Sequence, residues 1–177
     1  MKYRRADIKG GTYFFTINLA NRQNTLLVDE FAKLRRSINK VKQQHPFLLD
    51  ALVVLPDHLH LMMTLPENDH NFATRLMLIK SGFSRQIPKT EYISSSRQSK
   101  AERGIWQRRY WEHLIRDEND YARHIDYIHY NPVKHGYVER AVDWQFSTIH
   151  KFIEKGVLAA DWGAGVELTD NHLFGER

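Results

Sequence analysis

Residues 49–65, LDALVVLPDHLHLMMTL, decide the fold, because two apolar runs follow each other with only Pro56-Asp57 between them. Apolar runs of this length are typical of buried strands, and a Pro-Asp pair is typical of a turn. Strands joined by so short a connection pair antiparallel, since a parallel pair needs a much longer crossover. We therefore predict a hairpin formed by residues 49–55 and 58–65.

Elements on either side of the hairpin complete a recognisable order. Residues 12–19 are rich in β-branched and aromatic residues, which indicates a first strand. Helices are predicted over residues 29–44, with Asp29 as the cap, and 72–87, since apolar residues recur there at helical spacing. Residues 104–115 are predicted as a fourth strand. The order β, α, β, β, α, β predicts an α+β fold, a ferredoxin-like antiparallel sheet with helices on one face.

The remaining segments extend this sheet within a chain of 177 residues, for which we predict a single domain over residues 1–177. Residues 89–103 are polar and rich in serine, so we predict a flexible loop there. Another helix is predicted to open at Asp117 or Asn119 and to end near Asn131-Pro132, because the residue before a proline is disfavoured in the helical region. Apolar residues over about 149–177 predict a tail that packs on the domain.

The composition is that of a globular protein with a modest basic excess. There are 26 Lys and Arg against 21 Asp and Glu, and the resulting net charge of +5 favours polyanionic partners. The absence of cysteine excludes disulfides, thiolate zinc sites and a cysteine nucleophile. The sequence shows neither an export signal nor a long apolar run, so we expect a cytoplasmic location and no membrane partner.

His58 and His60 are the first candidate functional residues. Side chains alternate between the faces of a strand, so both imidazoles project to one side while Leu59 and Leu61 project to the other. Two imidazoles on one face can hold a divalent metal ion. A pair of surface histidines without a function would show the same spacing, so a second feature has to separate the two interpretations.

The helix predicted after Asp117 supplies that second feature. Tyr127 and Asn131 lie one turn apart on one side of it, and an apolar stripe occupies another side. The carboxamide oxygen of Asn131 and the two imidazoles would leave open positions for a phosphate oxygen and water around Mg²⁺ or Mn²⁺, and zinc would tolerate the histidines too. The phenol of Tyr127 could then attack a phosphate beside the metal ion. This combination predicts a metal-dependent nuclease.

Other residues could assist or replace Tyr127. A phenol with an ordinary pKa of about 10 is mostly protonated at neutral pH, so a base or the metal has to help. His124, about one turn earlier, could assist, although a phosphate contact or a surface position explains it better. Asp57 and Asp126 could orient histidines, although a turn cap and a solvated carboxylate explain them better. Four other tyrosines compete with Tyr127, and packing is the role we predict for the last three of them: Tyr110, Tyr121, Tyr130 and Tyr137.

Two other functions remain open on these residues. A non-catalytic binding module with a ferredoxin-like fold could display Tyr13, Phe15 and further aromatic residues to single-stranded DNA or RNA. It would explain the charge but not the histidines and the tyrosine. A metal-dependent hydrolase would instead use water as the nucleophile, and its cleavage would survive Tyr127→Phe.

Motifs along nearly the whole chain resemble the REP-associated tyrosine transposases, a bacterial branch of the HUH endonucleases related to insertion-sequence transposases that act on single strands. No single motif identifies the family, but the order and spacing of the motifs are specific to it. The matching stretches are YRR at 3–5, GGTYFFT at 10–16, LPDHLH at 55–60, WQ at 106–107, His113 with IR at 115–116, HIDYIHYNPVKHG at 124–136 and DWQFS at 143–147.

The resemblance implies an enzyme that cleaves and rejoins single-stranded DNA at repeated extragenic palindromes (REPs), which are hairpins with a short conserved foot. Tyr127 would form a 5′-phosphotyrosine and release a 3′-OH, with His58, His60 and Asn131 holding Mg²⁺ or Mn²⁺. No nucleotide cofactor is implied, since the phosphotyrosine conserves the bond energy. With one catalytic tyrosine per chain, the active form could be a monomer or a dimer. The residues for which we predict DNA contacts are Arg4, Arg5, Lys9, Lys80, Arg108 and Arg109.

Overall fold

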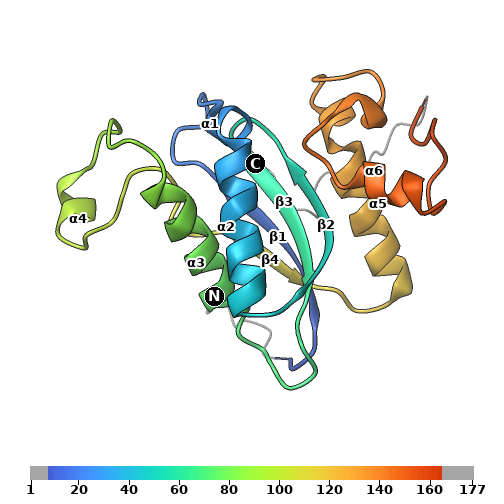
Figure 1. Ribbon diagram of the computed structural model, residues 1–177, viewed down its shortest axis with the longest axis horizontal. Helices are drawn as coiled ribbons and strands as arrows, with labels where there is room; N and C mark the ends of the chain where they lie inside the picture. Colours follow the sequence, from blue (N-terminus) through green and yellow to red (C-terminus); the bar gives the residue numbers. More distant parts are fainter. Residues whose placement is uncertain (1–7, 165–177) are drawn as a thin grey trace, which may run out of the picture.

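The computed structural model describes residues 8–164, and its centre is a four-stranded antiparallel sheet (Figure 1). The strands are ordered β2-β3-β1-β4 and span Thr12–Asn18 (β1), Leu48–Val54 (β2), His58–Thr64 (β3) and Trp111–Leu114 (β4). The predicted hairpin is the pair β2 and β3, and β3 also pairs with β1 in the interior of the sheet. This arrangement confirms the predicted α+β, ferredoxin-like class.

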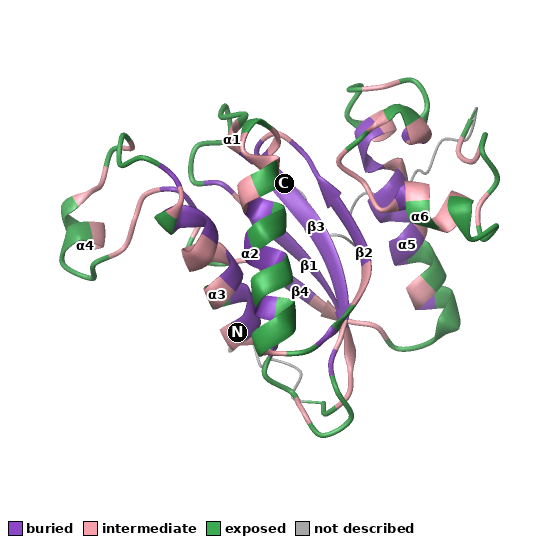
Figure 2. Ribbon diagram, in the orientation of Figure 1, coloured by how far each residue is buried: buried purple, intermediate pink, exposed green. Residues whose placement is uncertain are grey.

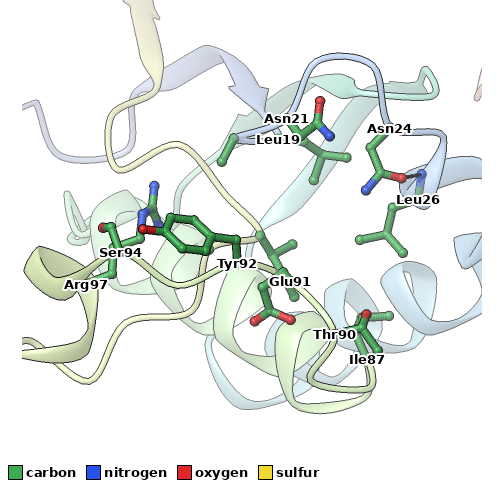
Figure 3. Close-up of a pocket in the computed structure, with 13 residues that line it drawn as sticks. Leu19, Asn21, Asn24, Leu26, Ile87, Thr90, Glu91, Tyr92, Ser94 and Arg97 are labelled. Atoms are coloured by element: carbon green, nitrogen blue, oxygen red, sulfur yellow. Dashed lines mark hydrogen bonds between the residues drawn. The ribbon is translucent and has the colours of Figure 1, made fainter.

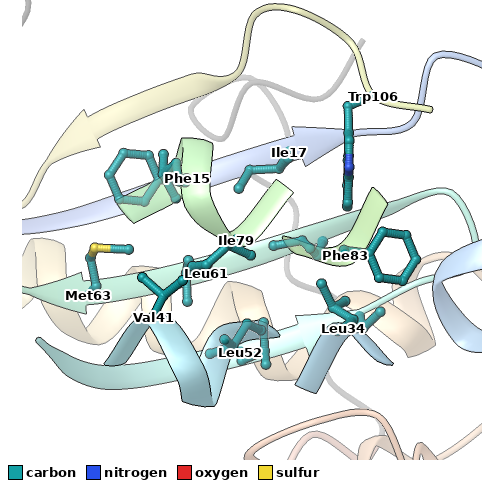
Figure 4. Close-up of a cluster of buried hydrophobic side chains, with 14 of the residues drawn as sticks. Phe15, Ile17, Leu34, Val41, Leu52, Leu61, Met63, Ile79, Phe83 and Trp106 are labelled. Atoms are coloured by element: carbon teal, nitrogen blue, oxygen red, sulfur yellow. The ribbon is translucent and has the colours of Figure 1, made fainter. Parts of the chain in front are cut away.

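Two helices cover one face of the sheet, as the sequence pattern predicted. They are α2 (Phe31–Gln44) and α3 (Phe72–Arg85), which pack against each other and against the strands (Figure 1). The side chain of Asn71 caps α3 by accepting a hydrogen bond from the backbone N–H of Thr74 at 3.0 Å. The main hydrophobic core lies between these helices and the sheet (Figure 4), and Leu59 and Leu61 of β3 belong to it. Alternate residues of β3 therefore point away from this core.

The opposite face of the sheet is covered by α5 (Glu118–Lys134), as Figure 1 shows. The side chain of Asp117 caps α5 by accepting a hydrogen bond from the backbone N–H of Asp120 at 2.8 Å. Buried residues lie on both sides of the strands (Figure 2), so the sheet is enclosed from both faces. The second, smaller core that joins α5 to the sheet consists of Phe14, Ala51, Val53, Met62, Ile125, Tyr127 and Ile128.

The segment before α2 differs from the prediction. Residues 26–29 form a separate short helix, α1 (Leu26–Asp29), and α2 starts only at Phe31. Asp29 therefore ends α1 and does not cap a helix that runs to residue 44. Its carboxylate accepts a hydrogen bond from the hydroxyl of Thr25 at 2.7 Å, a local contact that holds the side chain within α1.

The segment between α3 and β4 differs as well. Residues 104–115 do not form one continuous strand, because β4 begins at Trp111 and the preceding stretch meets the sheet in an isolated bridge between Trp106 and Leu19. Residues 89–103, predicted as a flexible loop, contain a short helix, α4 (Ser95–Gln98). Arg103 ties this segment to the end of α3, since it donates to the carbonyl of Ile87 at 2.8 Å.

The helix α5 continues past Pro132 to Lys134, although we predicted its end near Asn131-Pro132. Proline removes one backbone donor, but the last turn stays hydrogen-bonded because the N–H of His135 donates to the carbonyl of Asn131 at 3.0 Å. Asn131 and Pro132 are both buried, so packing against the rest of the fold outweighs the local preference against a helix.

The chain after α5 returns to β2. It contains a 3₁₀ turn, η1 (Ala141–Asp143), and a short helix, α6 (Ile149–Glu154). The indole N–H of Trp144 donates to the carbonyl of Val54 at 2.9 Å, which fixes this segment beside the end of β2. Of the tail predicted over residues 149–177, the part beyond residue 164 lies outside the described residues. Within residues 8–164, none of the helices has the length and apolar character needed to cross a membrane.

Candidate active site

His58 and His60 lie side by side on the face of β3 that α5 covers. Both are buried, at 2% and 0% exposure, and their ring centroids are 5.0 Å apart with the planes nearly perpendicular. Leu59 and Leu61 belong to the core on the other face, so the predicted alternation is confirmed. The interpretation as a pair of surface histidines is wrong, because neither ring is on the surface.

Each of the two imidazoles is held through its Nδ1 atom. Nδ1 of His60 lies 3.0 Å from the hydroxyl oxygen of Thr16, its direct partner on β1, and Nδ1 of His58 lies 2.7 Å from a carboxylate oxygen of Asp57. A histidine oriented through one nitrogen presents the other, here Nε2, to a metal ion. Both histidines therefore have the supporting partners that metal-ligating histidines need, of which Thr16 was not foreseen from the sequence.

The carboxylate of Asp57 is shared by His58 and Arg22. Arg22 forms an ion pair with it at 2.6 Å, from the loop that follows β1. Burial alone would raise the pKa of Asp57, but the hydrogen bond with His58 and the positive charges of His58 and Arg22 together lower it. Asp57 is thus an ionised partner that can orient His58. The alternative of a plain turn residue does not account for these contacts.

Tyr127 lies directly against His60 from the side of α5. Its ring meets the ring of His60 edge-on, with the centroids 5.2 Å apart, and the ring of Phe14 at 6.0 Å. The side chain is buried, at 5% exposure. The structure therefore brings together the strand-borne histidine pair and the helix-borne tyrosine that the sequence singled out.

Lys134 contacts Tyr127 from two turns further along α5. Its Nζ atom donates a hydrogen bond to the phenol oxygen at 3.2 Å and lies 4.8 Å from the ring centroid. Lys134 was not among the predicted site residues, because the helix was expected to end before it. A spacing of seven residues, which is close to two helical turns, is the signal that could have found it.

Asn131 is fully buried one turn beyond Tyr127, on the same side of α5. Two imidazole nitrogens and a carboxamide oxygen form a donor set that suits a divalent ion with open positions for other ligands. The residues present therefore fit a metal ion. Asp126, the other carboxylate considered for an orienting role, is partly buried, and its burial raises its pKa.

His124 is buried, so the interpretation of this residue as a surface histidine is wrong. Its Nδ1 atom lies 2.7 Å from the backbone carbonyl of Asp120, and its ring stacks on that of His113 at 4.7 Å. A carboxylate oxygen of Asp120 accepts from Nε2 of His113 at 2.8 Å and from the backbone N–H of Arg116 at 3.0 Å. Burial lowers the pKa of His124, although its hydrogen bond with Asp120 opposes this effect.

His113, Asp120 and His124 form a second group that could hold a metal ion, since their ligand atoms all lie within 4.8 Å of one another. The hydrogen bonds within this cluster give it a simpler role, because they join β4 to the first turn of α5. The ring of His124 also lies 4.8 Å from that of Phe14, which contacts Tyr127. The cluster therefore supports the helix that carries the tyrosine.

The competing tyrosines have other surroundings. The hydroxyl of Tyr121 donates to Asp50 at 3.2 Å, and burial together with that carboxylate raises the pKa of Tyr121 to about 12. Tyr110 packs against Phe15 in the core on the far side of the sheet. Tyr137 stacks on Trp144 at 5.3 Å. These contacts fit packing roles and leave Tyr127 beside the histidines.

The residues predicted to contact DNA are spread over several places. Arg4 and Arg5 lie outside the described residues, whereas Lys9 and Arg109 are exposed. Lys80 donates to the carbonyl of Gln107 at 2.8 Å, and burial, with a contribution from the charge of Arg97, lowers its pKa to about 8. Arg108 pairs with Glu102 at 2.6 Å. The structure thus gives Lys80 and Arg108 partners within the protein.

Two hollows lie elsewhere on the molecule. A groove of about 1150 Å³ runs between α3 and residues 85–110 and is lined by Lys80 and Arg108. A pocket of about 490 Å³, shown in Figure 3, lies between residues 19–26 and 87–105. Neither is lined by His58, His60 or Tyr127. These three candidate catalytic side chains lie instead at the interface between the sheet and α5.

Comparison with known proteins gives consistent results. Residues 9–131 match the family model described as "Transposase IS200 like". The chain is 45% identical over 165 residues to the REP-associated tyrosine transposase of Escherichia coli, covering 93% of this chain and 92% of that protein. It is 48% identical over 167 residues to a Haemophilus influenzae protein assigned to the same group, covering 94% and 95% of the two chains.

A solved structure is similar over the whole length of the chain. It is described as a REP-associated tyrosine transposase bound to a REP hairpin, and it shares 44% sequence identity and a TM-score of 0.85 with this protein. The similarity covers 100% of this chain and 98% of the solved one.

Proposed function

The chain belongs to the REP-associated tyrosine transposases within the IS200-like transposase family, and from this premise we propose that it cleaves and rejoins single-stranded DNA at REP-like hairpins through a covalent bond to Tyr127. The observation that carries the proposal is the contact between Tyr127 and His60, whose rings lie 5.2 Å apart beside His58. A phenol next to two oriented imidazoles combines a nucleophile with metal ligands, which is the combination that transesterification of a phosphodiester needs.

The metal ion of the proposal is Mg²⁺ or Mn²⁺, held by His58, His60 and Asn131. When bound, it would polarise the phosphate and neutralise charge on the phosphate oxygens. Asp57 and Thr16 hold the two imidazoles by their Nδ1 atoms, so the ligands are oriented by the protein itself. His113, Asp120 and His124 are the alternative ligand group, but hydrogen bonds within the cluster already engage Nε2 of His113 and Nδ1 of His124.

The chemical step conserves bonds and charge. The phenol of Tyr127 releases its proton to water, and the electron pair on the phenol oxygen forms a bond to phosphorus while the bond from phosphorus to the 3′ oxygen breaks. The 3′ oxygen leaves with its electron pair and takes up a proton from water. The products are a 5′-phosphotyrosine and a free 3′-OH, and attack by that hydroxyl reverses the step and rejoins the strand without a nucleotide cofactor.

The proposed substrate is hairpin DNA. A relative that is 44% identical is described as bound to a REP hairpin, which supports the same class of partner for this chain. The net charge of +5 favours a polyanion, and exposed cations such as Lys9 and Arg109 are available for phosphate contacts. Arg4, Arg5, Lys80 and Arg108 remain predicted contacts, and the last two would have to exchange their internal partners for DNA.

The test is the formation of a covalent adduct. A single-stranded REP-type hairpin oligonucleotide, incubated with the protein and Mn²⁺, is expected to give a protein–DNA band that resists denaturation. Tyr127→Phe should abolish the band, whereas Tyr130→Phe, on the same helix, should retain it. A binding module would shift the oligonucleotide without cutting it, and a water-using hydrolase would cut it in the Tyr127→Phe variant. Either result would overturn the proposal.

A further inference from the structure

The ammonium group of Lys134 contacts the proposed nucleophile in two ways. Its Nζ atom donates to the phenol oxygen of Tyr127 at 3.2 Å and also lies over the aromatic ring, 4.8 Å from the centroid. The phenol lies in the buried interface, so a charge at this position acts in surroundings where electrostatic interactions are less screened than in water.

The register of α5 creates this contact. Seven residues separate Tyr127 from Lys134, and at 3.6 residues per turn they lie almost two full turns apart on the same side of the helix. A helix that ended at Asn131 would not carry residue 134 on that side. The continuation past Pro132 therefore determines whether a cation reaches the phenol.

We propose that Lys134 is a further catalytic residue, which fixes the position of the phenol oxygen of Tyr127 and balances the negative charge on that oxygen during cleavage and rejoining. The inference rests on the proposed function, because it takes Tyr127 as the nucleophile. A charge-assisted hydrogen bond is stronger than one between neutral groups, so the interaction tightens as the oxygen becomes anionic. Stabilisation of this kind favours the reacting state over the resting state, which is the condition for acceleration.

The same interaction acts in both directions of the reaction. During cleavage the phenol has released its proton to water, and Lys134 balances the oxygen until its electron pair forms the bond to phosphorus. During rejoining the bond between phosphorus and Tyr127 breaks, the electron pair returns to the phenol oxygen, and Lys134 balances it again. Loss of Lys134 should therefore slow both directions and leave their ratio unchanged.

Two imidazoles also lie in this part of the interface between the sheet and α5. His60 meets the ring of Tyr127 and is held at Nδ1 by Thr16, while His124 directs its Nδ1 atom to Asp120 and packs on Phe14. A simpler role for Lys134 is to neutralise the carbonyl end of α5, because it lies in the last turn. Any cation in that turn would serve this role, and its loss would change stability rather than the rate of adduct formation.

The experiment compares the rate of covalent adduct formation at saturating REP-type hairpin oligonucleotide and Mn²⁺. Lys134→Met, which keeps the unbranched side chain up to the ε position but removes the ammonium group, is expected to slow the reaction by about 100-fold, in the range seen when a donor to a reacting oxygen is removed. Lys134→Arg should recover part of the rate. The matched control is Lys151→Met, an exposed lysine on α6, which should react like the unchanged protein. Hairpin affinity should be the same in all three variants.

A second measurement separates chemistry from folding. Tyr127 is replaced by 3,5-difluorotyrosine, whose phenolate needs less stabilisation, and the replacement is made with and without Lys134→Met. It should speed the reaction more in the Lys134→Met background, a comparison that is independent of any shared loss of stability. An unchanged rate in Lys134→Met, or equal effects of the fluorinated residue in both backgrounds, overturns the inference. If Tyr127→Phe still forms the adduct, the proposed nucleophile is wrong, whatever Lys134 does.

Discussion

The ring of Tyr127 meets the ring of His60 edge-on across the interface between α5 and β3, with 5.2 Å between the centroids. More than sixty residues of chain separate the two positions, so the contact is a product of the tertiary fold. It places the proposed nucleophile on one element and a proposed metal ligand on another, the arrangement that joint action on a single phosphate requires.

Asp57→Asn is expected to weaken metal binding while the fold is kept. The carboxylate of Asp57 holds Nδ1 of His58 at 2.7 Å, and loss of such an outer partner typically costs about 10- to 100-fold in metal affinity. The Mn²⁺ concentration that gives half-maximal adduct formation should rise by a similar factor. Asp126→Asn, on α5, serves as the control, and an identical Mn²⁺ dependence in Asp57→Asn would contradict the orienting role.

His129 makes the stability of the protein sensitive to acid. It is fully buried on α5, and its Nε2 atom is hydrogen-bonded to the hydroxyl of Thr148 at 3.1 Å. The centroid of its ring lies 4.6 Å from that of Phe152. Burial, with a smaller effect from the charge of His150, lowers the pKa of His129 to about 4. In the unfolded chain a histidine has a pKa of about 6.5, so the unfolded state takes up a proton first as the pH falls.

The contribution of His129 to the free energy of unfolding is therefore fully present above about pH 6.5, and it is lost as the pH falls to about 4. From pH 7 to pH 5 the contribution of His129 to the free energy of unfolding should fall by about 2 kcal/mol. Urea unfolding at the two pH values measures it. The free energy of unfolding should decline less in His129→Leu than in the unchanged protein. In His150→Gln it should decline by nearly as much as in the unchanged protein. Equal declines in His129→Leu and the unchanged protein would refute the assignment.

Asp120→Ala tests whether the cluster with His113 and His124 acts through hydrogen bonds. The substitution leaves Nε2 of His113 and the backbone N–H of Arg116 without their carboxylate acceptor, and we expect the free energy of unfolding to fall by roughly 2 to 3 kcal/mol. Asp120→Asn, which keeps one acceptor oxygen, should lose less. In a His58→Ala/His60→Ala variant, which lacks two ligands of the proposed metal site, chelation by EDTA should leave the Tm unchanged. A large fall in that variant would identify the Asp120 cluster as a metal centre.

Asn71→Ala tests the start of α3. The side chain of Asn71 satisfies the backbone N–H of Thr74, and loss of such a cap typically costs about 1 kcal/mol. Asn71→Asp should preserve most of the stability, because its carboxylate can accept the same hydrogen bond. Urea unfolding provides the measurement, and equal losses in the two variants would show that the cap has no special role.

The parts of the fold and site that sequence analysis predicted depend on local patterns. Alternation in β3 placed His58 and His60 on one face, and the short Pro56-Asp57 connection fixed the hairpin, because both depend only on neighbouring residues. The helical spacing of Tyr127 and Asn131 suggested that the tyrosine acts beside the histidines, and the resemblance implied the same role; the structure places the ring of Tyr127 against that of His60.

The parts that were missed depend on packing between distant segments. Pro132 suggested the end of a helix, yet burial of Asn131 and Pro132 carries α5 on to Lys134. The cluster around Asp120 requires His113 on β4 to meet the first turn of α5, and no spacing along the chain predicts that meeting. The boundaries of β4 were wrong for the same reason, since the sheet and not the local composition determines where the pairing starts.

The order of the site residues along the chain has a consequence for synthesis of the protein. A nascent chain that has emerged only as far as β3 carries His58 and His60 but not Tyr127, because α5 comes later in the sequence. Under the proposed function, such an incomplete chain would carry metal ligands without a nucleophile. Under this function, no strand could be cut before synthesis had passed residue 127 and α5 had docked beside β3.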